Sequence, residues 1–82
     1  MPDPSDIVFT GPFERQVRVS ADRQTITHHA MAWSTDYTPH ELVRWIDFYE
    51  RMVSRRDTPQ FRADVEVLHK ARELLASEQG RR

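Results

Sequence analysis

Residues 34–45, STDYTPHELVRW, hold the densest group of potentially reactive side chains in the sequence. Two acids, one histidine, one tyrosine and three hydroxyl groups occupy these twelve positions. Such side chains supply the general acids, general bases and nucleophiles of many enzymes. A catalytic role for Asp36, His40 or Glu41 is therefore the first hypothesis to weigh against a structural one.

Helix initiation explains the same residues. Thr38 precedes Pro39, which suits a first helical position, and Glu41 stands three residues after Thr38. This spacing is a capping box, in which the threonine oxygen accepts from the Glu41 amide and the glutamate accepts from the Thr38 amide. Tyr37 and Leu42 fit the two positions of a hydrophobic staple. Because these features agree on one register, we interpret the stretch as the start of a helix.

The other potentially reactive residues do not form a recognisable site. His28 and His29 are neighbours, so on a strand they point to opposite faces and cannot chelate one ion without a bulge. No serine lies in a nucleophile elbow, and the two glycines leave little material for a phosphate-binding loop. We predict no catalytic residue, no metal site and no cofactor, and hence a protein that is not an enzyme.

Arginines near the centre of the chain suggest nucleic-acid binding as an alternative function. Four of them gather around the expected turn between two helices: Arg51, Arg55, Arg56 and Arg62. Two helices joined by a short turn also allow a helix-turn-helix interpretation. Against it, the second helix carries acids that would repel phosphates, namely Asp64, Glu66, Glu73 and Glu78. Nucleic-acid binding is therefore disfavoured, and a solvated basic turn is the ordinary interpretation of the arginines. A solvated helix face is the ordinary interpretation of acids such as Asp64 and Glu66.

The elements that must position these residues change from strands to helices near residue 34. The expected β segments are a short strand at 7–9, a strand at 13–20, a loop of about four residues at 20–23 and a return strand at 24–33. Arg15 is the exception on the apolar face of the second strand. The phase of the return strand is ambiguous, which leaves open a strand buried on both sides, a bulge near His28-His29 or a helix over 28–33.

Two amphipathic helices are predicted at about 39–54 and 59–77. Their core stripes are Leu42, Trp45, Ile46, Tyr49, Met52 and Val53 on the first helix, and Phe61, Val65, Leu68, Ala71 and Leu75 on the second. Thr58 and Pro59 repeat the cap-plus-proline pattern, with Asp57 as a rival cap. The short connection predicts an antiparallel helical hairpin.

Both helices are apolar over a wider arc than a two-layer domain needs. Val43 and Phe48 flank the stripe of the first helix, and Val67, Leu74 and Ala63 form an edge stripe on the second. This surplus is either extra core or an exposed contact patch. We favour contact, because 82 residues bury little surface alone and a partner would supply more burial.

Composition sets the broad class. A net charge of −1 gives no global field for nucleic acid or anionic membrane, and the absence of cysteine excludes disulfides. The acidic, proline-rich N-terminus is unlike a signal peptide, and no apolar run could span a membrane, so we expect a cytoplasmic protein. Eleven arginines against one lysine are typical of a high-GC bacterium or its phage.

We therefore predict an α+β fold: a small antiparallel β-meander or hairpin of two or three strands within residues 7–33, followed by an antiparallel helical hairpin packed on one face. The domain is expected to span 7–79, with a flexible arm at 1–6 and a tail at 80–82. The predicted function is a non-enzymatic protein-interaction module, a regulator or adaptor that binds a protein partner or itself. Neither a membrane nor a small-molecule substrate is expected as a partner. The predicted contact residues are Phe48, Val67 and Leu74 as apolar anchors, with Arg55, Arg56 and Arg62 as a steering rim.

Overall fold

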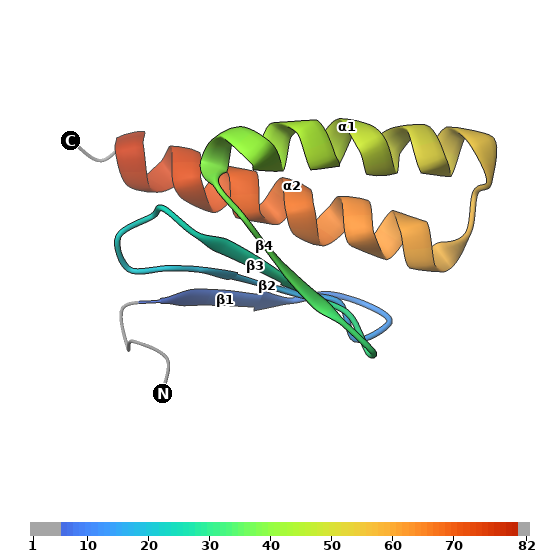
Figure 1. Cartoon of the computed structure of the whole chain (residues 1–82), viewed down its shortest axis with the longest axis horizontal. Coiled ribbons are helices and arrows are strands. Elements are labelled where there is room, and N and C mark those ends of the chain that lie inside the picture. Colours follow the sequence, from blue (N-terminus) through green and yellow to red (C-terminus); the bar gives the residue numbers. More distant parts are fainter. Residues whose placement is uncertain (1–5, 81–82) are drawn as a thin grey trace.

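The computed structural model describes residues 6–80 and places four strands ahead of two helices (Figure 1). The elements are β1 (Ile7–Thr10), β2 (Gln16–Val19), β3 (Ile26–His29), β4 (Ser34–Tyr37), α1 (Pro39–Arg55) and α2 (Pro59–Gly80). The strands pair antiparallel in the order β1-β2-β3-β4, which is a meander. The predicted α+β class and helical hairpin are confirmed, with one or two strands more than expected.

The extra strand, β4, lies at residues 34–37, beyond the predicted strand region of 7–33 and in the stretch that we interpreted as the start of a helix, so that bound is wrong. The predicted return strand, residues 24–33, holds β3 and the turn that follows it. The Ala30 amide donates to the Trp33 carbonyl at 2.8 Å, which closes a tight turn between β3 and β4. Turn residues here are alanine, methionine, alanine and tryptophan, without the glycine, proline, asparagine or aspartate that usually mark a turn. This turn also explains the ambiguous phase, because the chain reverses direction where a single strand was expected.

The first hairpin turn is strained. The Arg15 amide donates to the Pro12 carbonyl at 3.2 Å, and the two residues between them, Phe13 and Glu14, have φ of 56° and 58°. Positive φ at both central positions is the type I′ geometry that glycine and asparagine usually supply. Phe13, expected on the inner strand face, therefore lies in this turn and is exposed.

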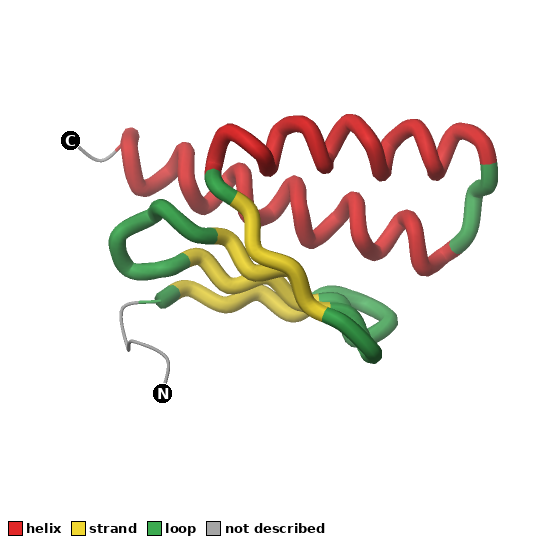
Figure 2. Tube along the Cα trace, viewed as in Figure 1, coloured by secondary structure: helices red, strands yellow, loops and turns green. Residues whose placement is uncertain are grey.

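The two helices cover one face of the sheet unequally. In Figures 1 and 2, α1 and α2 lie side by side and antiparallel, with α2 nearer the sheet. α2 packs on β1, β2 and β3, whereas α1 packs mainly on α2 and meets the sheet at β4. One side of α1 is therefore left without a neighbouring element in the described part of the chain.

The ends of the described chain modify two predictions about the termini. Most of the predicted arm, residues 1–5, and the last two residues of the predicted tail, 81–82, lie outside the described residues. Asp6 accepts a hydrogen bond from the Ala21 amide at 2.8 Å, so it is tied to the turn between β2 and β3. Gly80 is the last residue of α2, three residues beyond the predicted end of the helix.

The helix starts agree closely with the sequence. At Thr38 both halves of the capping box form: the Glu41 amide donates to the threonine hydroxyl at 3.1 Å, and the Thr38 amide donates to the Glu41 carboxylate at 2.9 Å. Tyr37 and Leu42, the predicted staple, are both buried in the core. At the second helix the Phe61 amide donates to the Thr58 hydroxyl at 3.3 Å, so Thr58, not Asp57, is the cap.

Candidate functional site

A buried histidine lies at the centre of the polar contacts in this fold. Through its two ring nitrogens, His28 on β3 contacts the Tyr37 hydroxyl at 3.1 Å and an Asp64 carboxylate oxygen at 3.0 Å. An ionised carboxylate only accepts, so Nε2 carries the proton that is donated to Asp64. In the neutral imidazole, Nδ1 then accepts the hydrogen bond that the Tyr37 hydroxyl donates. Both nitrogens are occupied, and the His28 side chain is fully buried.

Arg15 completes this cluster from the other side. Its Nε donates to the same Asp64 oxygen at 3.0 Å, so one carboxylate oxygen accepts from both an arginine and a histidine. Asp64 lies on the core face of α2, between Phe61 and Leu68 at helical spacing, and is almost fully buried. The sequence interpretation of Asp64 as part of a solvated acidic face is therefore wrong.

The sequence held a signal for this pair. Arg15 was the single charged residue on an apolar strand face, and Asp64 falls within an apolar helix stripe. Two opposite charges at inward positions of packed elements are expected to pair, because an unpaired buried charge is very costly. They are 49 residues apart in the chain, so spacing alone could not connect them.

Burial also keeps the hydroxyl groups of the surrounding tyrosines protonated. Removal from water raises the pKa of Tyr37 well above its ordinary value, and Asp64 and Tyr49 add to the rise. The pKa of Tyr49 is raised by burial in the same way. Tyr37 is therefore a protonated donor at neutral pH, which agrees with its bond to His28. The cluster orients β3, β4 and α2 relative to one another.

Aromatic rings connect this buried cluster to the surface. The ring of Trp33 meets His28 edge-on at 5.0 Å between centroids, and Tyr49 does so at 5.7 Å. Trp45 stacks on Tyr37 with centroids 5.6 Å apart. Phe48 then contacts both Trp45 and Tyr49, at 5.3 and 5.2 Å. The packing is continuous from the buried histidine outward to the exposed rings of α1.

The surface end of this packing is a stripe along α1. We call it the outer stripe and define it as Glu41, Trp45, Phe48, Met52 and Arg55, which recur every three or four residues and so lie on one side of the helix. Trp45 is 38% exposed and Phe48 is 40% exposed. The buried face of the same helix, Leu42, Ile46 and Tyr49, lies about a quarter turn away.

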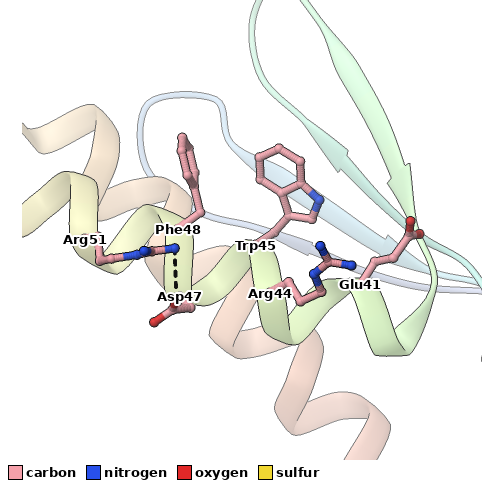
Figure 3. Close-up of a pocket in the computed structure, with 6 residues that line it drawn as sticks. All are labelled: Glu41, Arg44, Trp45, Asp47, Phe48 and Arg51. Carbon is pink, nitrogen blue, oxygen red and sulfur yellow. Dashed lines mark ion pairs between the residues drawn. The ribbon is translucent and has the colours of Figure 1, made fainter.

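Two shallow hollows follow the outer stripe. The first is lined by Glu41, Arg44, Trp45, Asp47, Phe48 and Arg51, and Figure 3 shows the rings of Trp45 and Phe48 projecting side by side from the helix. The second is lined by Phe48, Arg51, Met52 and Arg55. Every lining residue belongs to α1, so the hollows are surface depressions that have no opposing wall.

The predicted anchors divide between surface and core. Phe48 lies exposed on the outer stripe, and its role as a contact residue stays a prediction. Val67 is completely buried, so the prediction that it is a surface anchor is wrong. The chain after β1 folds over it: a Cβ added at Gly11 would lie 2.6 Å from a Val67 methyl group. Leu74 is partly buried and packs against the core, and Ala63 is buried, so the surplus width of α2 is core.

Only some of the arginines predicted to form the rim are available to contact a partner. Arg62 is bound through two nitrogens to the carboxylate of Asp57, and Arg51 pairs with Asp47 at 3.1 Å. The hydrogen bonds from Arg62 lower the pKa of the Asp57 carboxyl. Arg55 and Arg56 are exposed and make no ion pair within residues 6–80.

The open face of the sheet is polar. From β1 to β4 the aligned outward residues include Val8, Arg18, Thr27 and Asp36. The Thr27 hydroxyl donates to Asp36 at 2.8 Å. We therefore interpret this face as solvated.

Within residues 6–80, no group of three or more histidine, aspartate or glutamate side chains is placed to hold a metal ion. Over the same residues, neither helix is long and apolar enough to cross a bilayer. His29 is only partly buried and faces away from His28, as expected for neighbours on a strand.

The chain matches no family model, and neither the curated proteins nor the solved structures contain a match to it. The fold and the outer stripe are therefore the basis for any functional conclusion.

Proposed function

We propose that this chain is a small non-enzymatic protein-interaction module, a regulator or adaptor whose contact surface is the outer stripe of α1. The observation that carries the proposal is the exposure of Trp45 and Phe48 beside a core that is already closed without them. Large apolar rings on a surface cost solvation free energy, and clusters of them mark contact sites. Tryptophan is also among the residues that most often dominate interface energies.

The packing beneath the stripe supports this function. Trp45 stacks on the buried Tyr37, and Phe48 contacts the buried Tyr49. These two rings are held in place before any partner binds, so little side-chain entropy remains to be lost on association. Pre-positioned anchors of this kind are typical of interface hot spots.

The charged residues near the outer stripe indicate what kind of partner would fit it. Arg44 and Arg55 lie on or beside the stripe, are exposed, and make no ion pair within the described residues. Glu41 gives the stripe one acidic end. A partner with an apolar centre and acidic groups at its edge would complement the arginines.

The same proposal includes the source of the protein and its location in the cell. The excess of arginine over lysine supports a source with high GC content, a bacterium or its phage. A cytoplasmic regulator or adaptor is the role that we assign to the chain there.

Photocrosslinking tests the contact surface directly. Benzoylphenylalanine at position 48 replaces an exposed ring with a larger one, and the same residue at position 43 is the matched control. Val43 is 49% exposed on the same helix but lies about 140° away around the helix axis. Irradiation of the purified chain, alone and in an extract of its native cells, is expected to give a protein adduct from position 48 and none from position 43.

The adduct decides the proposal. Identification of the crosslinked peptide by mass spectrometry shows whether the partner is another protein or this same chain. Equal adducts from positions 43 and 48, or none from either, would show that the outer stripe is not a contact surface.

Nucleic-acid binding is the second candidate, favoured by Arg55 and Arg56 at the turn between the helices, which make no ion pair within the described part of the chain. Pairing of Arg51 and Arg62 with carboxylates weakens it, because those two guanidinium groups are already neutralised. The remaining positive charge is small beside the multiple phosphate contacts that such binding needs.

A further inference from the structure

The outer stripe of α1 carries opposite charges at equal distances on the two sides of its centre. Glu41 stands seven residues before Phe48, and Arg55 stands seven residues after it. Between them, the positions three and four residues from Phe48 hold Arg44 and Trp45 on one side and Arg51 and Met52 on the other. Of these, Trp45 and Met52 belong to the outer stripe. The stripe therefore has an acidic end, an apolar centre and a basic end.

We propose that the outer stripe binds a second copy of this chain, with the two α1 helices antiparallel across a two-fold axis at Phe48. This inference rests on the proposed function and names the partner. In such a pair, a residue a given number of positions before Phe48 faces the residue the same number after it in the second copy. Phe48 then faces Phe48, and each Glu41 faces an Arg55.

The charges fit this orientation and oppose the parallel one. In the antiparallel pair two Glu41–Arg55 ion pairs form, one at each end of the contact. In a parallel pair Glu41 would face Glu41 and Arg55 would face Arg55, which is repulsive at both ends. The helix dipoles also favour the antiparallel arrangement, because opposite ends of the two helices are then adjacent.

Both charged groups are able to make the contact. Glu41 uses one carboxylate oxygen for the Thr38 amide, so its second oxygen can accept from another donor. The capping hydrogen bonds lower the pKa of the Glu41 carboxyl, which keeps it ionised at neutral pH. Arg55 is exposed and is free of ion pairs within residues 6–80.

The centre of the contact combines apolar and cationic groups. Trp45 of one copy faces Arg51 of the other, and the planar guanidinium group can stack on the indole ring while it keeps its ion pair with Asp47 of its own chain. Trp45 and Arg51 line the same hollow on α1, next to Phe48. Symmetry repeats this contact, so two tryptophans and two arginines surround the pair of phenylalanines.

The expected dimer is weak. One helix stripe on each side buries less than the area of a standard stable interface, about 1,200 to 2,000 Å² in total. A dissociation constant in the micromolar range is therefore expected, and the protein exchanges between monomer and dimer with concentration.

Complementary charge reversal tests the orientation. Arg55→Glu places glutamate opposite Glu41 at both ends, and Glu41→Arg places arginine opposite Arg55 at both ends. Each variant alone should dimerise roughly tenfold more weakly than the original chain, since exposed pairs contribute little individually. An equimolar mixture should regain the affinity, because the mixed dimer pairs a doubly acidic stripe with a doubly basic one.

Sedimentation equilibrium of the full chain measures these affinities, from about one micromolar to about one millimolar so as to bracket the expected constant. Circular dichroism confirms that each variant is folded, which matters because Glu41→Arg removes half of the capping box. Phe48→Glu is the variant expected to abolish the dimer, and Val43→Glu, with the same added charge on another side of α1, should leave it intact.

The outcomes separate this inference from the proposed function. A monomer at every concentration, a dimer indifferent to Phe48→Glu, or charge variants that do not restore each other would overturn the antiparallel dimer. In each of those cases an adduct with a different protein from position 48 would still support the interaction function. Absence of both results would overturn the inference and the function together.

Discussion

At the scale of single residues, the network around Asp64 shows how a small core tolerates charge. Asp64 accepts from His28 and Arg15 through one oxygen, and the three residues come from α2, β3 and the segment before β2. A buried ion pair contributes little net stability compared with apolar residues of the same volume. Its value here is positional, because only one register of α2 on the sheet satisfies all three groups.

Removing the carboxylate should therefore be costly. Asp64→Ala leaves a buried histidine and a mostly buried arginine without their shared acceptor, and we expect a loss of about 3 kcal/mol in the free energy of unfolding. Asp64→Asn, which keeps an acceptor but not the charge, should lose less. Urea unfolding followed by circular dichroism measures both.

Asp57→Ala is the matched control, since Asp57 also pairs with an arginine but on the surface. Its effect on stability should be small, because solvent screens exposed pairs. Equal losses for Asp57→Ala and Asp64→Ala would mean that the buried network does not hold the fold in register.

At the scale of elements, the contact between the first hairpin turn and α2 determines which face of α2 is core. Gly11, just after β1, lies against the fully buried Val67. This contact converts the edge stripe of α2 into core, whereas the corresponding surplus on α1, Phe48 and Val43, stays exposed because α1 meets the sheet at β4.

Gly11→Ala tests this close approach. Gly11 has a negative φ, so alanine fits the backbone and would stabilise the fold slightly if space were free. The added Cβ would instead lie 2.6 Å from a Val67 methyl carbon, so we expect a loss of about 1–3 kcal/mol. Urea unfolding measures whether Gly11→Ala raises or lowers the free energy of unfolding. A rise would mean that space is free at Gly11, and a fall would mean that the added Cβ meets Val67.

A double-mutant cycle with Val67→Ala identifies the cause. Val67→Ala removes the clashing methyl, so the double variant should lose less stability than the sum of the single losses. Additive losses would place the strain somewhere other than the contact between Gly11 and Val67.

The same elements show what the sequence could and could not predict. Local rules located the helices, because Thr38, Glu41 and Thr58 act within a few residues of where they stand. The turn between β3 and β4 was missed because residues 30–33 include none of the residue types that usually mark a turn. The pairing of Arg15 with Asp64 and the burial of Val67 depend on how α2 lies on the sheet, which no local pattern specifies.

At the scale of the whole molecule, the distribution of charge opposes a nucleic-acid function. The net charge is −1, and carboxylates already pair with two of the four arginines near the helix–helix turn. Proteins that bind duplex DNA commonly neutralise six to ten phosphates. Arg55 and Arg56 alone would give an electrostatic free energy too small for measurable binding.

We therefore expect no binding to labelled duplex or single-stranded oligonucleotides at about 50 mM salt, where non-specific electrostatic affinity is high. Fluorescence anisotropy measures this for the original chain and for Arg55→Ala/Arg56→Ala. Arg72→Ala, which removes an exposed arginine from α2, is the control. Binding that falls steeply with salt and is lost only when Arg55 and Arg56 are replaced would favour the nucleic-acid function, because it would show that two exposed arginines at this turn suffice to hold phosphates.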